Sequence, residues 1–239
     1  AFFVKNVAEE LQTIVGSRVD KIHQPEKNEL VFSIYGAGKN QRLIASANPN
    51  YPRVLVSGQE FENPDVPPMF CMLLRKYLIP GRIAEVNQVS YERSMEIVFE
   101  SRDELGDNKK WRLFTELTGR HANIIFADSD GRIIDSIRKI DITMNESRQI
   151  LPGLFYKPLS DDGKKELGEK IDFEGKDGEI FTILLSGYKG LSPLIAREIC
   201  YRAFGRVDIR ADEVSSFDKL YMEVENVTSE KIPTLLVKE

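Results

Sequence analysis

The chain has 239 residues, 41% of them hydrophobic and 30% charged, with a formal net charge of −5. This composition predicts a soluble globular protein of one large or two ordinary domains that needs no disulfide or metal to fold. Residues 159–239 contain 17 acidic and 12 basic residues, which leaves 21 of each for residues 1–158. The charge argues against indiscriminate binding of polyanions but allows a local basic patch that recognises a nucleic acid.

The cysteines and histidines of this chain show no pattern typical of a metal centre. Cys71 and Cys200 each lie in an apolar segment, far apart in sequence, a spacing that suits no zinc site. Two buried thiols indicate a reducing compartment. There is no apolar stretch of membrane-spanning length and no charged-then-apolar leader, so we expect a cytoplasmic chain with no membrane partner and no cofactor.

The first half of the chain reads as a helix, a meander of strands and a second helix. Residues 3–15 carry apolar side chains at helical spacing and end at Gly16. Prolines precede a second apolar helix at 69–78, which Ile79-Pro80-Gly81 ends. Strand-like runs between the helices, separated by Pro25, Gly36-Ala37-Gly38 and 48–50, occur at residues 18–24, 29–35, 42–47 and 53–57.

A second meander follows, and then a charged tether and a helical region. Asp130-Gly131 predicts a two-residue hairpin between the last two strands. Residues 159–178 are charged and glycine-bearing, and we interpret them as a linker. Residues 179–205 read as two helices joined by a glycine turn, and the tail 211–239 is helical at first. The strands of this meander are predicted at residues 82–90, 93–101, 109–117, 122–128 and 132–140.

The strand pattern predicts that two turns distant in sequence lie side by side. If strand 93–101 turns at residues 103–107 and pairs with strand 109–117, Arg93 lies opposite Leu117. Glu92-Arg93 then lies beside the Thr118–His121 turn at one end of the sheet. The charged and aromatic side chains that converge there are Glu92, Arg93, Glu116, Arg120 and His121.

This cluster has a functional and a structural interpretation. A guanidinium can stack on a base or bind its acceptors, and a carboxylate can accept from an exocyclic amine, so the cluster suits nucleotide recognition. Solvated turn residues, with Arg–Glu pairs worth about 0–1 kcal/mol, are the alternative.

The turn before the second C-terminal helix is the other candidate site. Gly190 permits a tight turn, Ser192 can cap the helix, and Pro193 fits its first position. The pattern resembles the helix-hairpin-helix module, in which backbone amides, here those of Gly190, Leu191 and Ser192, bind a phosphate. A plain helical hairpin is the alternative. The glycines at 36–40 lack phosphate-loop spacing and predict a hairpin, and no arrangement of catalytic residues is present, so we expect no enzyme.

Several blocks of sequence, in order, resemble the NFACT-N domain, which heads the family long labelled fibronectin-binding protein A. They are GSRVDKIHQP, RLIASANPNYPRV, NPDVPPMFCMLLRKYL, ELTGRHANII, GRIIDSI and ILPGLFY. The resemblance implies an α+β fold: an antiparallel-sheet NFACT-N domain (1–158) resembling the N-terminal domain of formamidopyrimidine-DNA glycosylases, then a linker (159–178), then a small all-α helix-hairpin-helix lobe with the start of a further helical region (179–239).

The resemblance also implies a function in ribosome quality control. Family members bind obstructed large ribosomal subunits that carry peptidyl-tRNA, and bacterial members recruit alanyl-tRNA so that the stalled chain receives an alanine tail. Residues matching the family's tRNA-binding motif are Glu92, Arg93, Glu116, Leu117 and Arg120, with His121 in the same Gly-Arg-His segment. Because Glu92 replaces the usual Asp and the usual Asp-Gly step does not precede the first helix, the sequence leaves the tRNA preference open. A glycosylase-like DNA-binding protein and a fibronectin-binding surface adhesin are the alternatives.

Overall fold

The computed structural model describes residues 1–103, 105–159, 163–167, 169–173 and 175–229. Contacts along the chain divide it into two compact units. The first, which we call the sheet unit, comprises Phe3–Val89 and Arg93–Leu159. The second, the helical unit, comprises Ala1–Phe2, Ser90–Glu92 and Ser160–Glu239. The predicted boundaries at residues 158 and 178 stay predictions.

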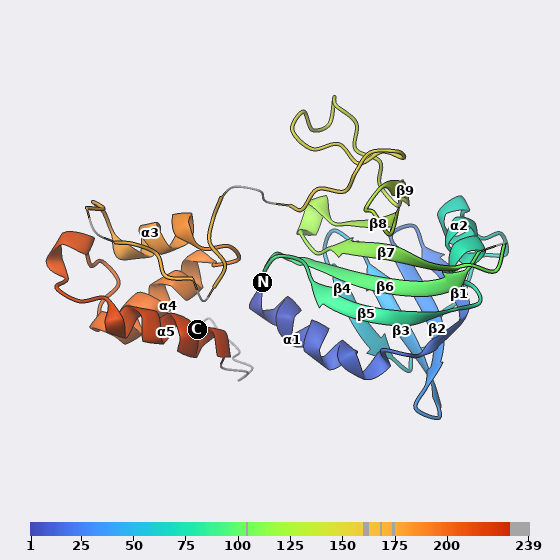
Figure 1. Ribbon diagram of the computed structural model, residues 1–239, viewed down its shortest axis with the longest axis horizontal. Helices are drawn as coiled ribbons and strands as arrows, with labels where there is room; N and C mark the ends of the chain where they lie inside the picture. The colour runs from blue at the N-terminus through green and yellow to red at the C-terminus, as the bar shows by residue number, and fades with distance from the viewer. Residues whose placement is uncertain (104, 160–162, 168, 174, 230–239) are drawn as a thin grey trace. The chain divides into compact units, whose positions relative to one another are not determined.

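The sheet unit is built on one antiparallel sheet of nine strands, in the order β4-β3-β2-β1-β5-β6-β7-β8-β9 (Figure 1). All consecutive strands pair except β4 and β5, which are separated by a helix. The strands are β1 Arg18–Glu26, β2 Glu29–Gly36, β3 Lys39–Ser46, β4 Arg53–Ser57, β5 Gly81–Gln88, β6 Ser94–Arg102, β7 Asn108–Glu116, β8 Asn123–Asp128 and β9 Ile133–Ser136. The predicted α+β class with a large antiparallel sheet is confirmed.

The turns follow from the glycines, with two differences from prediction. Gly36 pairs with Lys39, and Ala37 and Gly38 between them both have positive φ, as a tight two-residue hairpin requires. After β8, however, the Asp128 amide donates to the Arg132 carbonyl (3.0 Å), so the loop has three residues rather than the predicted two. Pro25 lies inside β1 instead of ending it. The β1–β2 register shifts between His23 and Glu26, so the position of Pro25 needs no backbone N–H for a ladder hydrogen bond.

Two helices belong to the first half of the sheet unit. Helix α1, Phe2–Glu10, continues as a 3-10 turn, Leu11–Ile14, and ends before Gly16, whose φ of +84° would strain any other residue. Helix α2 spans Met69–Leu78, the predicted range, and starts directly after Pro68.

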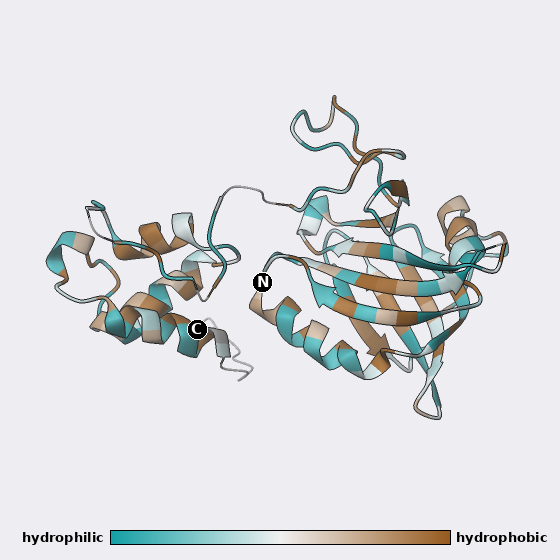
Figure 2. Cartoon of the chain, viewed as in Figure 1, coloured by the Kyte–Doolittle hydropathy of each residue, from teal (hydrophilic) through white to brown (hydrophobic). Residues whose placement is uncertain are grey.

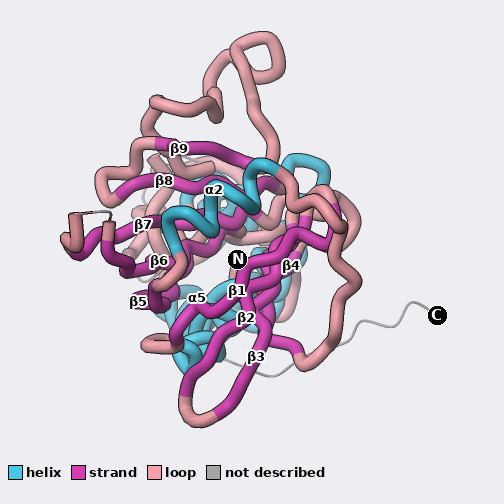
Figure 3. Tube along the Cα trace, turned by 90° about the vertical axis from the view of Figure 1, so that its right-hand side faces the viewer, coloured by secondary structure: helices cyan, strands magenta, loops and turns pink. Residues whose placement is uncertain are grey.

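The sheet curls so that its two halves enclose one core, and a second, smaller core lies on the opposite face. Phe32 of β2 stacks on Phe99 of β6 with ring centroids 5.5 Å apart, which joins strands that are distant in the sheet order. Figure 3 shows β1–β4 and β5–β9 as two groups of strands. Trp111 packs edge-on against Tyr77 of α2, with centroids 4.6 Å apart. On the other face, Phe114 belongs to a small cluster with Ile125 and Ile150.

The helical unit has a core of its own. Its helices are α3 Ile180–Gly187, α4 Pro193–Phe204 and α5 Asp218–Ser229, with a 3-10 turn at Ala211–Glu213. Figure 2 shows how strongly apolar α3 is. Ile171 and Phe173, within the predicted linker, are buried in this core, and Phe173 stacks on Phe217. Residues 230–239 of the predicted tail lie outside the described residues. No helix in the described ranges is long and apolar enough to cross a membrane.

Candidate nucleic-acid interface

The predicted meeting of two turns is present at one end of the sheet. Ser94 pairs with Glu116 and Ser101 with Lys109 along β6 and β7, which is the register that the sequence predicts. The Leu117 amide donates to the Arg93 carbonyl at 2.7 Å, so the ladder continues one step beyond the strands. Arg93 therefore lies beside the turn that leads from β7 to β8.

The side chains at this end are open to solvent. Arg93, Arg120 and His121 are exposed, and Leu117 is half-buried against the sheet core. Arg120 Nε donates to His121 Nε2 (3.0 Å), so Nε2 is the acceptor. We call Arg93, Leu117, Arg120 and His121 the arginine end. In the part of the chain that the structure describes, the Nη groups of Arg93 and Arg120 have no side-chain partner and can bind a planar acceptor.

Hydrogen bonds from Arg138 fix the backbone of the turn that carries Arg120. Gly119–His121 forms a 3-10 turn, and Gly119 has a φ of +61°, which favours glycine. Arg138 Nη1 donates to the carbonyl oxygens of Arg120 (2.6 Å) and Ala122 (3.4 Å). The buried Asn123 side chain fixes Arg138 in turn, because Oδ1 accepts from the Arg138 amide (3.0 Å) and Nδ2 donates to its carbonyl (2.8 Å). These bonds also explain why β9 ends at Ser136 and not at the predicted residue 140.

Glu116 reaches the same end but lies inside the protein. Its side chain is 1% exposed and forms a two-pronged ion pair with Arg148, of which the Nη1–Oε2 contact measures 3.3 Å. Arg148 also donates to the Lys157 carbonyl through Nε (2.9 Å) and Nη2 (2.7 Å). The carboxylate is therefore paired inside the protein in this structure, and its part in tRNA binding stays a prediction. The segment 137–158 packs over this face of β7 and covers Glu116, which the strand pattern did not reveal.

A tyrosine completes the buried cluster. Tyr156 stacks on Phe114 with ring centroids 3.7 Å apart, and its hydroxyl lies 3.4 Å from Ser94 Oγ. Burial raises the pKa of Glu116, and hydrogen bonding and charge from Arg148 oppose that rise. Burial and the neighbouring Glu116 charge also raise the pKa of Tyr156. This cluster, Glu116–Arg148–Tyr156, lies at the base of the arginine end, where Glu116 is buried.

The remaining predicted site residues lie in the helical unit. Glu92 is half-buried and belongs to that unit by its contacts, and its role stays a prediction. Gly190 has a φ of +71°, Ser192 Oγ accepts from the Ile195 amide (3.3 Å), and Pro193 is the first residue of α4. Leu191 packs against the helical core. The capped helix start is confirmed, whereas phosphate binding by Gly190, Leu191 and Ser192 stays a prediction.

Sequence reasoning missed the residues that support the site. Arg138 lies in the predicted strand 132–140 but beyond the actual end of β9 at Ser136, and Arg148 and Tyr156 follow the last predicted strand. One available signal was Asn123, a polar residue directly before the apolar run 124–127, which indicates a buried side chain that must find hydrogen-bond partners.

The comparison with known families decides where the chain belongs. The family model of the NFACT N-terminal and middle domains matches residues 1–235. The chain belongs to the NFACT-N family. Among NFACT-N relatives, the Rqc2 homolog RqcH of Bacillus subtilis is 40% identical over 199 residues, which cover 80% of this chain and 35% of that protein. The archaeal Rqc2 homolog aRqcH of Methanocaldococcus jannaschii is 29% identical over 98% of this chain and 36% of that protein. The chain thus spans about a third of the length of these relatives.

Solved NFACT-N structures share the fold. The N-terminal domain of the fibronectin-binding protein PavA from Streptococcus pneumoniae has a TM-score of 0.71 at 32% identity, covering 83% of this chain and 77% of that one. The fibrinogen binding protein from Staphylococcus aureus has a TM-score of 0.77 at 29% identity, covering 96% of this chain and 82% of that one.

Proposed function

We propose that this chain is the tRNA-binding N-terminal part of a ribosome quality-control factor. In this proposal the whole factor binds obstructed large ribosomal subunits that still carry peptidyl-tRNA. The factor recruits alanyl-tRNA, which serves to add an alanine tail to the C-terminus of the stalled chain. In this proposal the N-terminal part binds tRNA and catalyses no reaction. The observation that carries the proposal is the pair of exposed arginines, Arg93 and Arg120, on turns brought together by the β6–β7 ladder. The relatives named as Rqc2 homologs support the same assignment.

The arrangement suits unpaired bases better than a duplex. Two guanidinium groups and the His121 ring lie on adjoining turns, where they can stack on splayed bases and bind the hydrogen-bonding edges of those bases. Because Arg138 and Asn123 hold the backbone of one turn, the backbone at Arg120 loses little conformational freedom on binding. Within the proposal, Glu92 adds a carboxylate acceptor, and the hairpin Gly190–Ser192 contacts a phosphate in the manner of a helix-hairpin-helix module. A sheet unit resembling that of formamidopyrimidine-DNA glycosylases is part of the same proposal.

The test compares ligands and matched arginine variants. Binding of tRNA, duplex DNA and fibronectin is measured at about physiological ionic strength, which already weakens nonspecific polyanion binding. We expect Arg93→Ala and Arg120→Ala each to weaken tRNA binding by roughly tenfold or more, as for the loss of one specific guanidinium contact. Arg102→Ala is the control, because Arg102 is exposed at the opposite end of β6.

The outcomes separate the proposal from its alternatives. Preference for tRNA that both variants lose and the control keeps supports it. Equal binding of duplex DNA and tRNA, unaffected by the variants, favours a glycosylase-like DNA-binding protein. The fibronectin arm is included because the solved structure of the PavA domain belongs to a fibronectin-binding protein. Saturable fibronectin binding without tRNA binding favours an adhesin.

A further inference from the structure

The outward face of β1–β3 carries a second concentration of polar side chains, away from the arginine end. Lys21 pairs with Ser33 across β1 and β2, and Ser33 pairs with Arg42 across β2 and β3. Directly paired residues project from the same face of a sheet, so these three form one row. His23 and Val31 form the next row along the same strands. We call these two rows the floor. The first row carries the cations of Lys21 and Arg42, and the second carries an imidazole and an apolar side chain.

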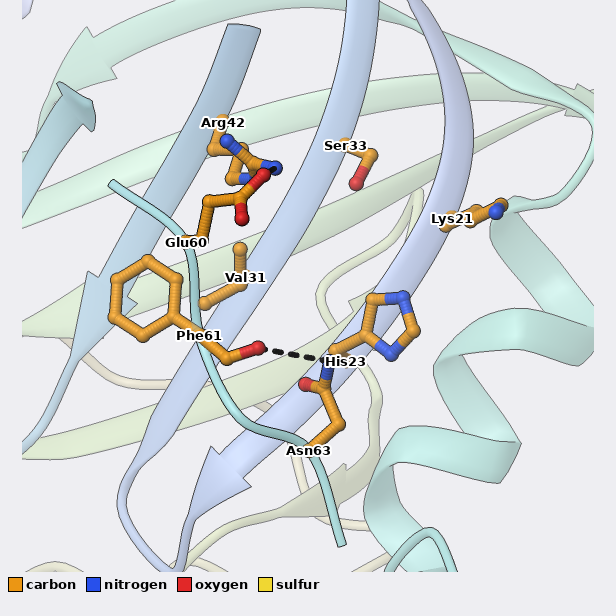
Figure 4. A pocket seen from close by; sticks show the side chains of 8 residues that line it. All are labelled: Lys21, His23, Val31, Ser33, Arg42, Glu60, Phe61 and Asn63. Carbon is orange, nitrogen blue, oxygen red and sulfur yellow. Dashed lines mark hydrogen bonds and ion pairs between the residues drawn. The ribbon is translucent and has the colours of Figure 1, made fainter. Parts of the chain in front are cut away.

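A segment beyond β4 turns this floor into a groove. Residues 58–63 cross the face and supply Glu60, Phe61 and Asn63 as a wall (Figure 4). The resulting cavity measures about 260 Å³, and it adjoins a second of about 300 Å³ that shares Lys21, Ser33 and Arg42. Volumes near the lower end of the range for ligand sites suit a small ligand of about one nucleotide.

The groove favours an anion. Arg42 ties the wall to β3 by donating to the Gly58 carbonyl (3.0 Å) and pairing with Glu60 (3.2 Å). The Glu60 side chain is 90% exposed, so this pair is weak and a ligand phosphate can compete for Arg42. The other carboxylate at the groove, Asp20, is occupied by Arg18 at 2.6 Å. Among the described residues Lys21 forms no ion pair, which leaves its charge to a ligand.

Two rings flank the apolar part of the floor. In Figure 4 the side chains of Phe61 and His23 lie on either side of Val31. Burial, and then the charges of Arg75 and Lys21, lower the pKa of His23, so its ring is neutral at pH 7. Arg75 Nη2 lies 3.5 Å from His23 Nδ1 and orients the ring. Two flat faces beside cations are the features with which proteins hold single unpaired nucleotides.

We propose that this groove binds one nucleotide, with its base between Phe61 and His23 and its phosphate against Lys21 and Arg42. Ser33 and Asn63 supply hydrogen-bonding groups beside the base. The nucleotide is either a free mononucleotide or one residue of a single-stranded RNA, and both present the same base and phosphate. An acidic peptide would use the cations but not the two rings, so the rings favour a nucleotide.

The test uses the 239-residue chain and small probes. Adenosine 5′-monophosphate, adenosine, inorganic phosphate and a single-stranded RNA hexamer are titrated separately by calorimetry, and an acidic peptide serves as the competing class. We expect saturable binding of the monophosphate, weaker binding of adenosine and phosphate, and tighter binding of the hexamer if the groove serves RNA. Phe61→Ala should weaken binding roughly five- to hundredfold, the range for loss of one stacked base. Lys21→Ala should weaken monophosphate binding but not adenosine binding.

A matched control separates a specific contact of Lys21 from the general effect of removing one positive charge. Lys27 is an exposed lysine at the β1–β2 turn, outside the groove, so Lys27→Ala should change the affinity less than twofold if the groove is specific. Equal effects of the two lysine variants, binding of the peptide in place of the nucleotide, or no saturable binding of any nucleotide would each overturn the proposal.

The proposal for the groove and the proposed function of the arginine end can each be overturned while the other holds. Loss of tRNA binding in Arg93→Ala with unchanged monophosphate binding supports both proposals. Wild-type tRNA binding without monophosphate or hexamer binding overturns the groove alone. Monophosphate binding without tRNA binding overturns the proposed function alone.

Discussion

The arginine end and the groove belong to the same sheet unit, yet they hold their cations in different ways. The side chains that support the arginine end are buried. Asn123 is fully buried, and the Glu116 side chain, which pairs with Arg148, is 1% exposed. At the groove, the wall is tied to β3 through Arg42 and a Glu60 side chain that is 90% exposed. Burial decides how much such pairs matter, because solvent screens an exposed pair whereas a buried charge without its partner is strongly destabilising.

This difference predicts two kinds of binding surface. The arginine end is preorganised, since its turn is fixed before any ligand arrives. The groove is adjustable, since its wall depends on a weak surface pair that a ligand can displace. Four tests examine the contrast, from the largest expected effect to the smallest.

Arg148→Met should be the most damaging change. It leaves the Glu116 carboxylate buried without its cationic partner, and breaking a buried pair in this way lowers the free energy of unfolding by about 3–5 kcal/mol. The loss should grow with pH. Burial raises the pKa of Glu116 above its ordinary 4.5, so the folded state retains a proton that the unfolded state has released, and stability falls as pH rises above that value.

The check is urea unfolding at pH 5 and pH 8, with Arg42→Met as the control. Because the Arg42–Glu60 pair is exposed, the control should lose only about 0–1 kcal/mol at either pH. Equal losses of unfolding free energy in the two variants would show that the buried pair and the exposed pair contribute equally to stability.

Arg138→Met should weaken both the turn and its ligand binding. The substitution deletes hydrogen bonds to the carbonyl oxygens of Arg120 and Ala122, and bonds from a charged donor contribute about 1.5–3 kcal/mol. If the bonds position Arg120, tRNA affinity should fall by about as much as in Arg120→Ala, and the double variant should lose little more. Additive losses in that double-mutant cycle would mean that Arg138 contacts the ligand independently.

A pair of glycine substitutions compares the two backbones directly. Gly119 has a φ of +61°, and a methyl group added to its α-carbon would make only ordinary contacts, so Gly119→Ala should cost about 1–2 kcal/mol through backbone strain alone. Gly58 in the groove wall has open space around it and no positive φ. Gly58→Ala should be neutral or stabilise by up to about 1 kcal/mol, by restricting the unfolded chain. Thermal unfolding of the two variants measures the difference, and a reversed order would contradict the contrast.

Glu60→Gln should have the smallest effect on stability, below about 1 kcal/mol, because its carboxylate is exposed. The same change frees Arg42 for a ligand phosphate, so adenosine monophosphate should bind roughly two- to fivefold more tightly. Calorimetric titration beside the wild type provides the measurement, and weaker binding would show that Glu60 holds the groove in shape.

The sequence predicted those parts of the fold that depend on local pattern. The helix at 69–78, the order of the strands within each meander and the β6–β7 register follow from apolar spacing and turn residues, because a slip of one residue would turn the buried side chains of β6 outward. The pairing of Arg93 with Leu117 is a consequence of that register and was therefore predictable.

The supporting contacts were not predictable in the same way. Arg148 meets Glu116 across 32 positions of sequence, through a segment with little regular secondary structure. Without a ladder there is no register to extrapolate, so the burial of Glu116 could not be calculated. The groove was missed for a related reason: the row Lys21, Ser33 and Arg42 follows from pairing, but the wall formed by residues 58–63 does not.

The single tryptophan of the chain gives the sheet unit an optical signature of its own. Trp111 packs on Tyr77 and donates its indole N–H to Ser101 Oγ at 2.9 Å, within the sheet unit. Its fluorescence therefore monitors that unit, whereas far-ultraviolet circular dichroism monitors the helices of both units, α1 and α2 as well as α3, α4 and α5. If the two signals vanish at different denaturant concentrations, the units melt as independent bodies; if they vanish together, the chain unfolds as one.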